Sequence, residues 1–142
     1  MNSMLPSPEN ATLERLEELA AQLWSELPHG AVVWLSGDIG GGKTTFARAL
    51  VGAASGEGAR SPTFALVNYY ESPAGLLIHV DCYRLQNPSE AVELDFPDLQ
   101  REARLLMIEW PENAGAYVPR PDAHFRFGHI ERRDERFVER LL

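Results

Sequence analysis

Apolar positions along the chain recur with a helical period in some segments and form short continuous runs in others. Between Thr12 and Leu27, leucine, alanine and tryptophan return every three or four residues, which predicts an amphipathic helix. Mostly apolar runs at Ala31–Ser36, Leu76–Asp81 and Leu105–Glu109 predict strands buried on both faces, as in a parallel sheet. A second helix is predicted over Thr44–Ala54.

The remaining segments are shorter, and they alternate between strand-like and helix-like patterns. Ser72–Gly75 is a turn sequence between two strand-like runs and predicts a hairpin. We therefore expect a mixed α/β domain with parallel strands at the centre, hairpins at the edges and flanking helices. The other predicted elements are a glycine- and serine-rich loop to Pro62, a strand at Thr63–Glu71, short helices at Pro88–Leu94 and Pro97–Ala103, a loop at Pro111–Pro121, a strand at Ala123–Ile130, a turn at Glu131–Glu135 and a strand at Arg136–Leu141.

The glycine-rich segment after the first apolar run carries the strongest functional signal. Gly37-Asp38-Ile39-Gly40-Gly41-Gly42-Lys43-Thr44 fits the pattern G-x-x-x-x-G-K-[ST] in full. Glycines allow consecutive backbone N–H groups to face anionic oxygens, and the helix that follows adds the positive end of its dipole. The pattern predicts a P-loop NTPase-like domain over residues 1–142. Its nucleotide-binding residues would be Gly37, Asp38, Gly40, Gly41, Gly42, Lys43, Thr44 and Thr45, with Lys43 on the phosphates and Thr44 on Mg²⁺.

Composition narrows the class of protein further. The net charge of −8 argues against direct binding of a nucleic-acid backbone. Twelve of the 13 basic residues are arginine, and the single lysine is Lys43, inside the glycine loop. One cysteine, Cys82, excludes an internal disulfide. We expect no signal peptide in the first ten residues and no membrane span, so the predicted location is cytoplasmic.

Two apolar runs end in an acid, which is where a P-loop protein needs a carboxylate to hold Mg²⁺ or to orient water. These acids are Asp81 and Glu109, and which of them is the main catalytic carboxylate stays open. The four histidines share no metal-ligand spacing. Of these, His79 is expected to pack beside the sheet.

Several motifs occur in a fixed order: the glycine loop, then Ser61-Pro62-Thr63-Phe64, then His79-Val80-Asp81-Cys82-Tyr83-Arg84-Leu85, then Ile108-Glu109-Trp110-Pro111-Glu112. This series resembles the bacterial TsaE (YjeE) family over about residues 8–138. Members of that family are small P-loop ATPases needed to make threonylcarbamoyladenosine in tRNA. The resemblance implies ATP/ADP and Mg²⁺ as cofactors, TsaD and TsaB as partners, and tRNA contacted through the partner complex.

The resemblance also implies roles for individual residues. Thr63 corresponds to a switch-like position that senses the γ-phosphate. Asp81 corresponds to the Walker B acid, and Glu109, together with Thr44, to the Mg²⁺ site. Glu9 and Arg133 correspond to positions near the nucleotide, one from each end of the chain. The predicted catalytic set is therefore Lys43, Thr63, Asp81 and Glu109.

A GTPase, a small-molecule kinase and an assembly switch are the three alternative functions. A GTPase usually carries N-K-x-D, and no lysine exists outside the glycine loop. A small-molecule kinase needs a substrate-binding insertion and a lid, for which only residues 87–104 offer room. An assembly switch would use ATP binding to control docking, with turnover as a reset. The favoured function combines this switch with weak ATPase activity, and the kinase is the alternative.

Overall fold

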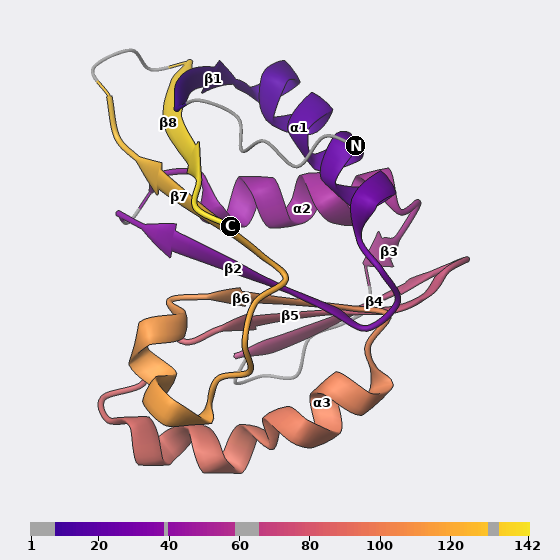
Figure 1. Cartoon of the computed structure of the whole chain (residues 1–142), viewed down its shortest axis with the longest axis vertical. Coiled ribbons are helices and arrows are strands. Elements are labelled where there is room, and N and C mark those ends of the chain that lie inside the picture. Colours follow the sequence, from indigo (N-terminus) through magenta and orange to yellow (C-terminus); the bar gives the residue numbers. More distant parts are fainter. Residues whose placement is uncertain (1–7, 39, 59–65, 131–133) are drawn as a thin grey trace.

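Two helical layers enclose one mixed β-sheet in a computed structural model of the chain (Figure 1), which describes residues 8–38, 40–58, 66–130 and 134–142. The strand order is β1-β8-β7-β2-β6-β5-β4-β3. The central strands β7, β2, β6 and β5 are parallel, and both edges are antiparallel. The strands are β1 Glu9–Thr12, β2 Ala31–Gly37, β3 Glu57–Gly58, β4 Val67–Ser72, β5 Gly75–Asp81, β6 Leu105–Glu109, β7 Ala123–Gly128 and β8 Glu135–Arg140.

Helices α1 (Leu13–Glu26) and α2 (Lys43–Ala53) cover one face of the sheet. The apolar side of α1 buries Leu16, Leu19, Ala20 and Leu23 against α2 and the sheet. Each buried leucine contributes about 1.5–3 kcal/mol of transfer free energy. The Thr12 hydroxyl begins α1 by accepting the backbone N–H of Arg15 at 3.1 Å. The first turn of α2 lies at the carboxyl end of β2, where ligands bind in parallel sheets.

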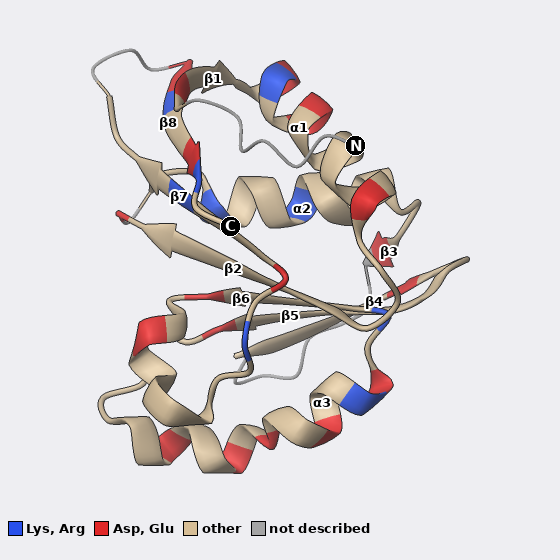
Figure 2. Ribbon diagram, in the orientation of Figure 1, with Lys and Arg blue, Asp and Glu red and all other residues tan. Residues whose placement is uncertain are grey.

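The opposite face carries α3 (Phe96–Glu102) and two 3₁₀ helices, η1 (Pro88–Leu94) and η2 (Pro111–Tyr117). Acidic residues are frequent on η1 and α3, where the ribbon of Figure 2 is coloured red at several positions. Glu90, Glu93, Asp98 and Glu102 lie there beside one arginine, Arg101. This negative face is unsuited to a phosphate backbone. In the part of the chain described, no helix combines the length and apolarity that crossing a membrane would require.

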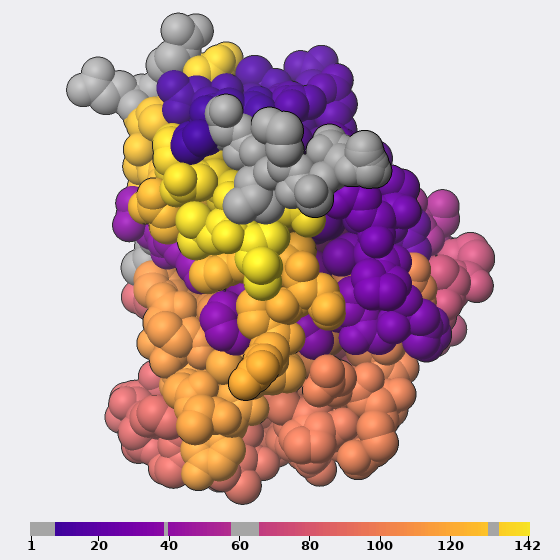
Figure 3. All heavy atoms as spheres, viewed as in Figure 1, coloured from indigo at the N-terminus to yellow at the C-terminus, as the bar shows by residue number. Residues whose placement is uncertain are grey.

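The first and last strands along the described chain, β1 and β8, pair at one edge of the sheet. Strand β1 pairs antiparallel with β8, in register from Glu9 opposite Val138 to Thr12 opposite Glu135. Figure 3 shows the indigo atoms of the first described residues next to the yellow atoms of the C-terminal strand, on the same face of the molecule. The residues at positions 9–16 and 134–138 are thereby brought to the end of the sheet where the glycine loop lies (Figure 1).

The predicted α/β architecture is confirmed, with the three apolar runs as neighbouring parallel strands. The predicted loop at 111–121 is wrong in its first half, because Pro111 begins a 3₁₀ turn, for which its fixed φ is suited. Strands β1 and β3 were not predicted, because four and two residues are too short to show alternation. The strand expected from Thr63 begins at Val67, and residues 63–65 lie outside the described part.

Candidate phosphate-binding site

Glycines determine the shape of the loop between β2 and α2. Gly37, Gly40 and Gly42 have φ values of 123°, 75° and 112°, which L side chains rarely adopt. Gly37 lies so close to β7 that a Cβ would fall 1.9 Å from the backbone oxygen of Phe127. Gly42 precedes α2 and has no side chain to cap the helix. The start of α2 is therefore open to an anion, which its N–H groups and dipole favour.

Lys43 is buried at the base of this loop and is only 4% exposed. Its Nζ donates hydrogen bonds to the backbone oxygens of Gly37, at 2.8 Å, and Asp38. The ammonium also lies 4.7 Å from the centre of the Trp110 ring. Burial lowers the pKa of Lys43, against the opposing effect of Glu109 and other acids. The loop thus holds a desolvated ammonium, whose attraction for phosphate oxygens is stronger than in water.

Glu109 ends β6 and is 3% exposed. Its Oε2 accepts a hydrogen bond from Thr44 Oγ1 at 2.8 Å and lies 2.7 Å from Nε2 of His79. Burial by itself raises the pKa of Glu109, but the hydrogen bonds and charges of His79, Thr44 and Lys43 together lower it below its usual value. Glu109 is therefore ionised at neutral pH, with its charge compensated by neighbouring donors.

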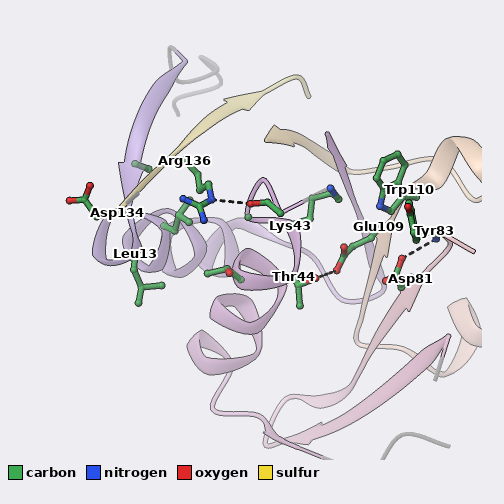
Figure 4. A pocket seen from close by; sticks show the side chains of 14 residues that line it. Leu13, Lys43, Thr44, Asp81, Tyr83, Glu109, Trp110, Asp134 and Arg136 are labelled. Atoms are coloured by element: carbon green, nitrogen blue, oxygen red, sulfur yellow. Dashed lines mark hydrogen bonds between the residues drawn. The ribbon is translucent and has the colours of Figure 1, made fainter. Parts of the chain in front are cut away.

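Asp81 lies beside Glu109, because the two strand ends are in register in the parallel pair β5–β6. Its Oδ1 accepts the backbone N–H of Tyr83 at 3.0 Å. The Tyr83 and Trp110 rings are 5.1 Å apart, centre to centre. Trp110 adopts a left-handed backbone conformation with φ 55°, which is uncommon for a side chain of this size. The turn after β6 thereby places an aromatic ring over Lys43 (Figure 4).

These groups converge on one cavity of about 680 Å³ (Figure 4). That volume is within the range of small-molecule sites. Its walls come from β1 and α1, the glycine loop and α2, the carboxyl ends of β5 and β6, and the start of β8. The lining residues are Ala11, Leu13, Leu16, Gly40, Gly42, Lys43, Thr44, Thr45, Asp81, Tyr83, Glu109, Trp110, Asp134 and Arg136.

The Thr44 hydroxyl and the Glu109 carboxylate are oxygen donors of the kind that Mg²⁺ prefers. Among the residues described, no group of three or more His, Cys, Asp or Glu side chains is placed to hold a metal. A cation here would therefore need phosphate or water oxygens as further ligands, which is the usual arrangement for Mg²⁺ in phosphoryl-transfer sites.

Most of the predicted site residues are brought together by the fold. Gly37, Asp38 and Gly41 form the loop, and Gly40, Gly42, Lys43, Thr44, Thr45, Asp81 and Glu109 line the cavity. Glu9 lies on β1, with its carboxylate bound to Arg15 at 2.8 and 3.1 Å, and it does not line the cavity. Thr63 and Arg133 lie outside the described residues.

Several residues that line the cavity were not predicted from the sequence. Leu13, Leu16, Asp134 and Arg136 line the cavity because β1 and β8 pair at its edge, and no short-range signal marks them. The Arg136 guanidinium donates hydrogen bonds to the backbone oxygens of Gly40 and Glu135, at 3.0 and 2.9 Å. His79 was expected to pack beside the sheet. It does lie in the sheet, but it also bonds to Glu109.

Cys82 provides a first test of the packing next to the site. Its thiol is fully buried, and burial, followed by the charges of Asp81 and Glu112, raises its pKa to about 12. We expect a disulfide reagent at pH 8 to label it at least 100-fold more slowly in the native protein than in guanidinium chloride, because the thiolate is the reactive form. Equal labelling rates in the two conditions would contradict the buried position.

The fold and this site together define a class of protein: a mixed α/β domain with a P-loop-like fold, whose glycine loop and acidic strand ends face one cavity. A solved structure with a similar fold is that of Bacillus subtilis YdiB, which has a TM-score of 0.70 and 20% sequence identity. The alignment covers 98% of this chain and 87% of that one.

The chain belongs to the family of threonylcarbamoyl adenosine biosynthesis protein TsaE, whose profile it matches over residues 10–138. Relatives named tRNA threonylcarbamoyladenosine biosynthesis protein TsaE occur in several bacteria. The Mycobacterium bovis protein is 34% identical over 90% of this chain and 83% of its own length. The Haemophilus influenzae protein is 31% identical over 77% and 68%. The Rickettsia felis protein is 38% identical over 70% of this chain, which spans only 58% of that relative.

Proposed function

We propose that the chain binds Mg²⁺–ATP in the 680 Å³ cavity and hydrolyses it slowly to ADP and phosphate. The observation that carries this proposal is the convergence of three features on one cavity. These are the uncapped start of α2, the ammonium of Lys43, and the paired oxygens of Thr44 and Glu109. Each feature serves a different part of a nucleoside triphosphate, namely the phosphate oxygens, their negative charge and the cation that accompanies them.

Each of the polar residues around the cavity would have a separate role. Lys43 would neutralise charge on the β- and γ-phosphates, and the N–H groups at the start of α2 would donate hydrogen bonds to their oxygens. Thr44 and Glu109 would hold Mg²⁺, which would supply Lewis-acid stabilisation of the phosphoryl oxygens. Asp81, next to Glu109 at the strand edge, would orient the attacking water.

We propose that the isolated chain turns ATP over slowly, because no described arginine of the cavity is well placed to act on the phosphates. Arg136 is the one arginine among the described residues that line the cavity, and its guanidinium is bound to the oxygens of Gly40 and Glu135. An arginine finger raises phosphoryl-transfer rates by about 10³–10⁵ where one is used. A guanidinium committed to two backbone oxygens is poorly placed for that role. We therefore propose that useful turnover requires a partner.

The biological setting is proposed from the family. The relatives are named for biosynthesis of threonylcarbamoyladenosine in tRNA. We infer that this chain uses ATP in the cytoplasm to cycle a TsaD–TsaB complex in that modification. We also infer that the nucleotide state is transmitted through the segment around Thr63. The net charge of −8 favours contact with tRNA through the complex rather than directly.

A small-molecule kinase is the alternative, and the region at 87–104 weighs against it. This was the one stretch with room for a mobile lid. It forms η1 and α3, whose residues Ala91, Phe96 and Leu99 are buried in the core beneath the sheet. A lid has to open and close over its substrate, whereas these helices are held by the core.

A product assay with a matched pair of variants tests the proposed function. The wild type should release phosphate and ADP and form no phosphorylated acceptor. Glu109→Gln removes the buried carboxylate charge at constant size, and we expect it to lower Mg²⁺-dependent turnover by about 100-fold. Binding of ADP without Mg²⁺ should change less than threefold. Glu112→Gln, an exposed acid nearby, is the control and should retain turnover. Equal loss in both variants, or a phosphorylated acceptor, would contradict the proposal.

A further inference from the structure

His79 makes a buried polar contact with Glu109, a residue of the proposed metal site. It comes from β5, and its Nε2 lies 2.7 Å from Oε2 of Glu109 on the neighbouring strand β6. The two side chains are 5% and 3% exposed. A histidine placed in the core only to fill space would be expected to bond to a backbone group or to water. Here the imidazole is directed at the one carboxylate that Thr44 also contacts.

The contact distinguishes the two oxygens of Glu109. Thr44 and His79 both bond to Oε2. In the described part of the chain, no buried side-chain nitrogen or oxygen lacks a hydrogen-bond partner. Since no hydrogen bond to Oε1 is found there and Glu109 lines the cavity, Oε1 is the oxygen that reaches the cavity. The hydrogen bonds to Oε2 thus determine that Oε1 is the oxygen facing the cavity.

The two donors on Oε2 are not equivalent. Thr44 lines the cavity and is itself a proposed Mg²⁺ ligand, so a bound metal would help to set the position of its hydroxyl. His79 lies behind the carboxylate on β5 and is not among the cavity-lining residues. Its bond therefore persists whether or not the cavity is filled. Groups that hydrogen-bond to metal ligands in this way typically change metal affinity 10–100-fold when they are removed.

We propose that His79 is a positioning residue for the metal site: its Nε2–H donates to Glu109 Oε2 and turns Oε1 toward the cavity. The inference deepens the proposed function and depends on it. It implies one tautomer of the ring, with the proton on Nε2, because an unprotonated nitrogen facing an ionised carboxylate would place two acceptors together.

A pair of amide substitutions tests the proposal. In His79→Gln the side-chain nitrogen lies three bonds from Cβ, as Nε2 does in histidine, so the donor to Glu109 can be restored. In His79→Asn the nitrogen lies two bonds from Cβ and falls short. The readout is the dissociation constant of ADP, measured by calorimetry with and without Mg²⁺. The value without Mg²⁺ divided by the value with Mg²⁺ reports the metal-dependent part of binding.

We expect His79→Asn to reduce that ratio at least 10-fold and His79→Gln to keep it within threefold of the wild type. Binding of ADP without Mg²⁺ should be unchanged within twofold in both. A ratio unchanged in His79→Asn, or equally reduced in both variants, would overturn the positioning role. If the wild type binds no nucleotide, or shows no effect of Mg²⁺, the proposed function fails instead, which separates the two failures.

A measurement on the wild type keeps the proposal testable should either variant fold poorly. Long-range ¹H–¹⁵N correlation spectra at pH 7 should show one of the four histidine rings with a slowly exchanging proton on Nε2. The same ring should be absent from the spectrum of whichever variant folds. A His79 ring protonated only on Nδ1 would overturn the inference, because no donor would then face Glu109.

Discussion

Replacing Lys43 by alanine should weaken the binding of ADP and ATP by about 100-fold while the chain stays folded. The cavity is lined by two cationic side chains, Lys43 and Arg136, and three acidic ones, Asp81, Glu109 and Asp134. Without the ammonium, a polyphosphate would face a lining dominated by carboxylates. A charge pair at about 4 Å is worth roughly 4 kcal/mol at an effective dielectric of 20. Part of that is offset because Lys43 gives up its bonds to two loop carbonyls.

The net of these effects, about 2.7 kcal/mol, corresponds to 100-fold in affinity. Titration calorimetry measures it directly, and circular dichroism checks the fold. Arg48→Ala is the control, because it removes one positive charge from the same helix at an exposed position outside this cavity. It should leave affinity within twofold. Nucleotide binding within threefold of the wild type in Lys43→Ala would show that the lysine is not part of the site.

Gly37→Ala should destabilise the protein by about 4 kcal/mol or more, at the upper end of what single substitutions do. Two independent effects add at this position. The residue has φ 123°, which an alanine adopts only under strain, and the new Cβ would fall 1.9 Å from the backbone oxygen of Phe127. The obstructing atom belongs to β7, a central strand, so the sheet itself would have to separate from the loop.

Urea unfolding followed by circular dichroism measures this loss of free energy. Gly52→Ala is the matched control, because Gly52 lies in α2 and a Cβ there would meet no atom within 4 Å. Alanine at a compatible helical position should stabilise the protein by about 0.5–1 kcal/mol. If the two substitutions have similar effects on the free energy of unfolding, the close approach of the loop to β7 is wrong.

The centre of the sheet and the chemistry of the loop could be predicted from the amino-acid sequence alone. Strands β2, β5 and β6 are apolar on both faces, so their burial can be recognised without knowing their neighbours. The glycine loop is contiguous, and each fixed position of its pattern (Gly37, Gly42, Lys43 and Thr44) has a steric or chemical requirement that only a few amino acids meet. Even the proximity of Asp81 to Glu109 was foreseeable, since parallel strands end at the same edge of the sheet.

The rest of the cavity depends on how distant parts of the chain pack together. Strand β1 has four residues, too few for a period to emerge, and it forms because β8 offers it an edge. That pairing brings Leu13, Leu16 and Arg136 to the site from opposite ends of the chain. The bond from His79 to Glu109 likewise spans 30 positions and depends on two side chains sharing one face of adjacent strands. Local patterns record which residues are buried, whereas strand order and register determine which buried residues meet.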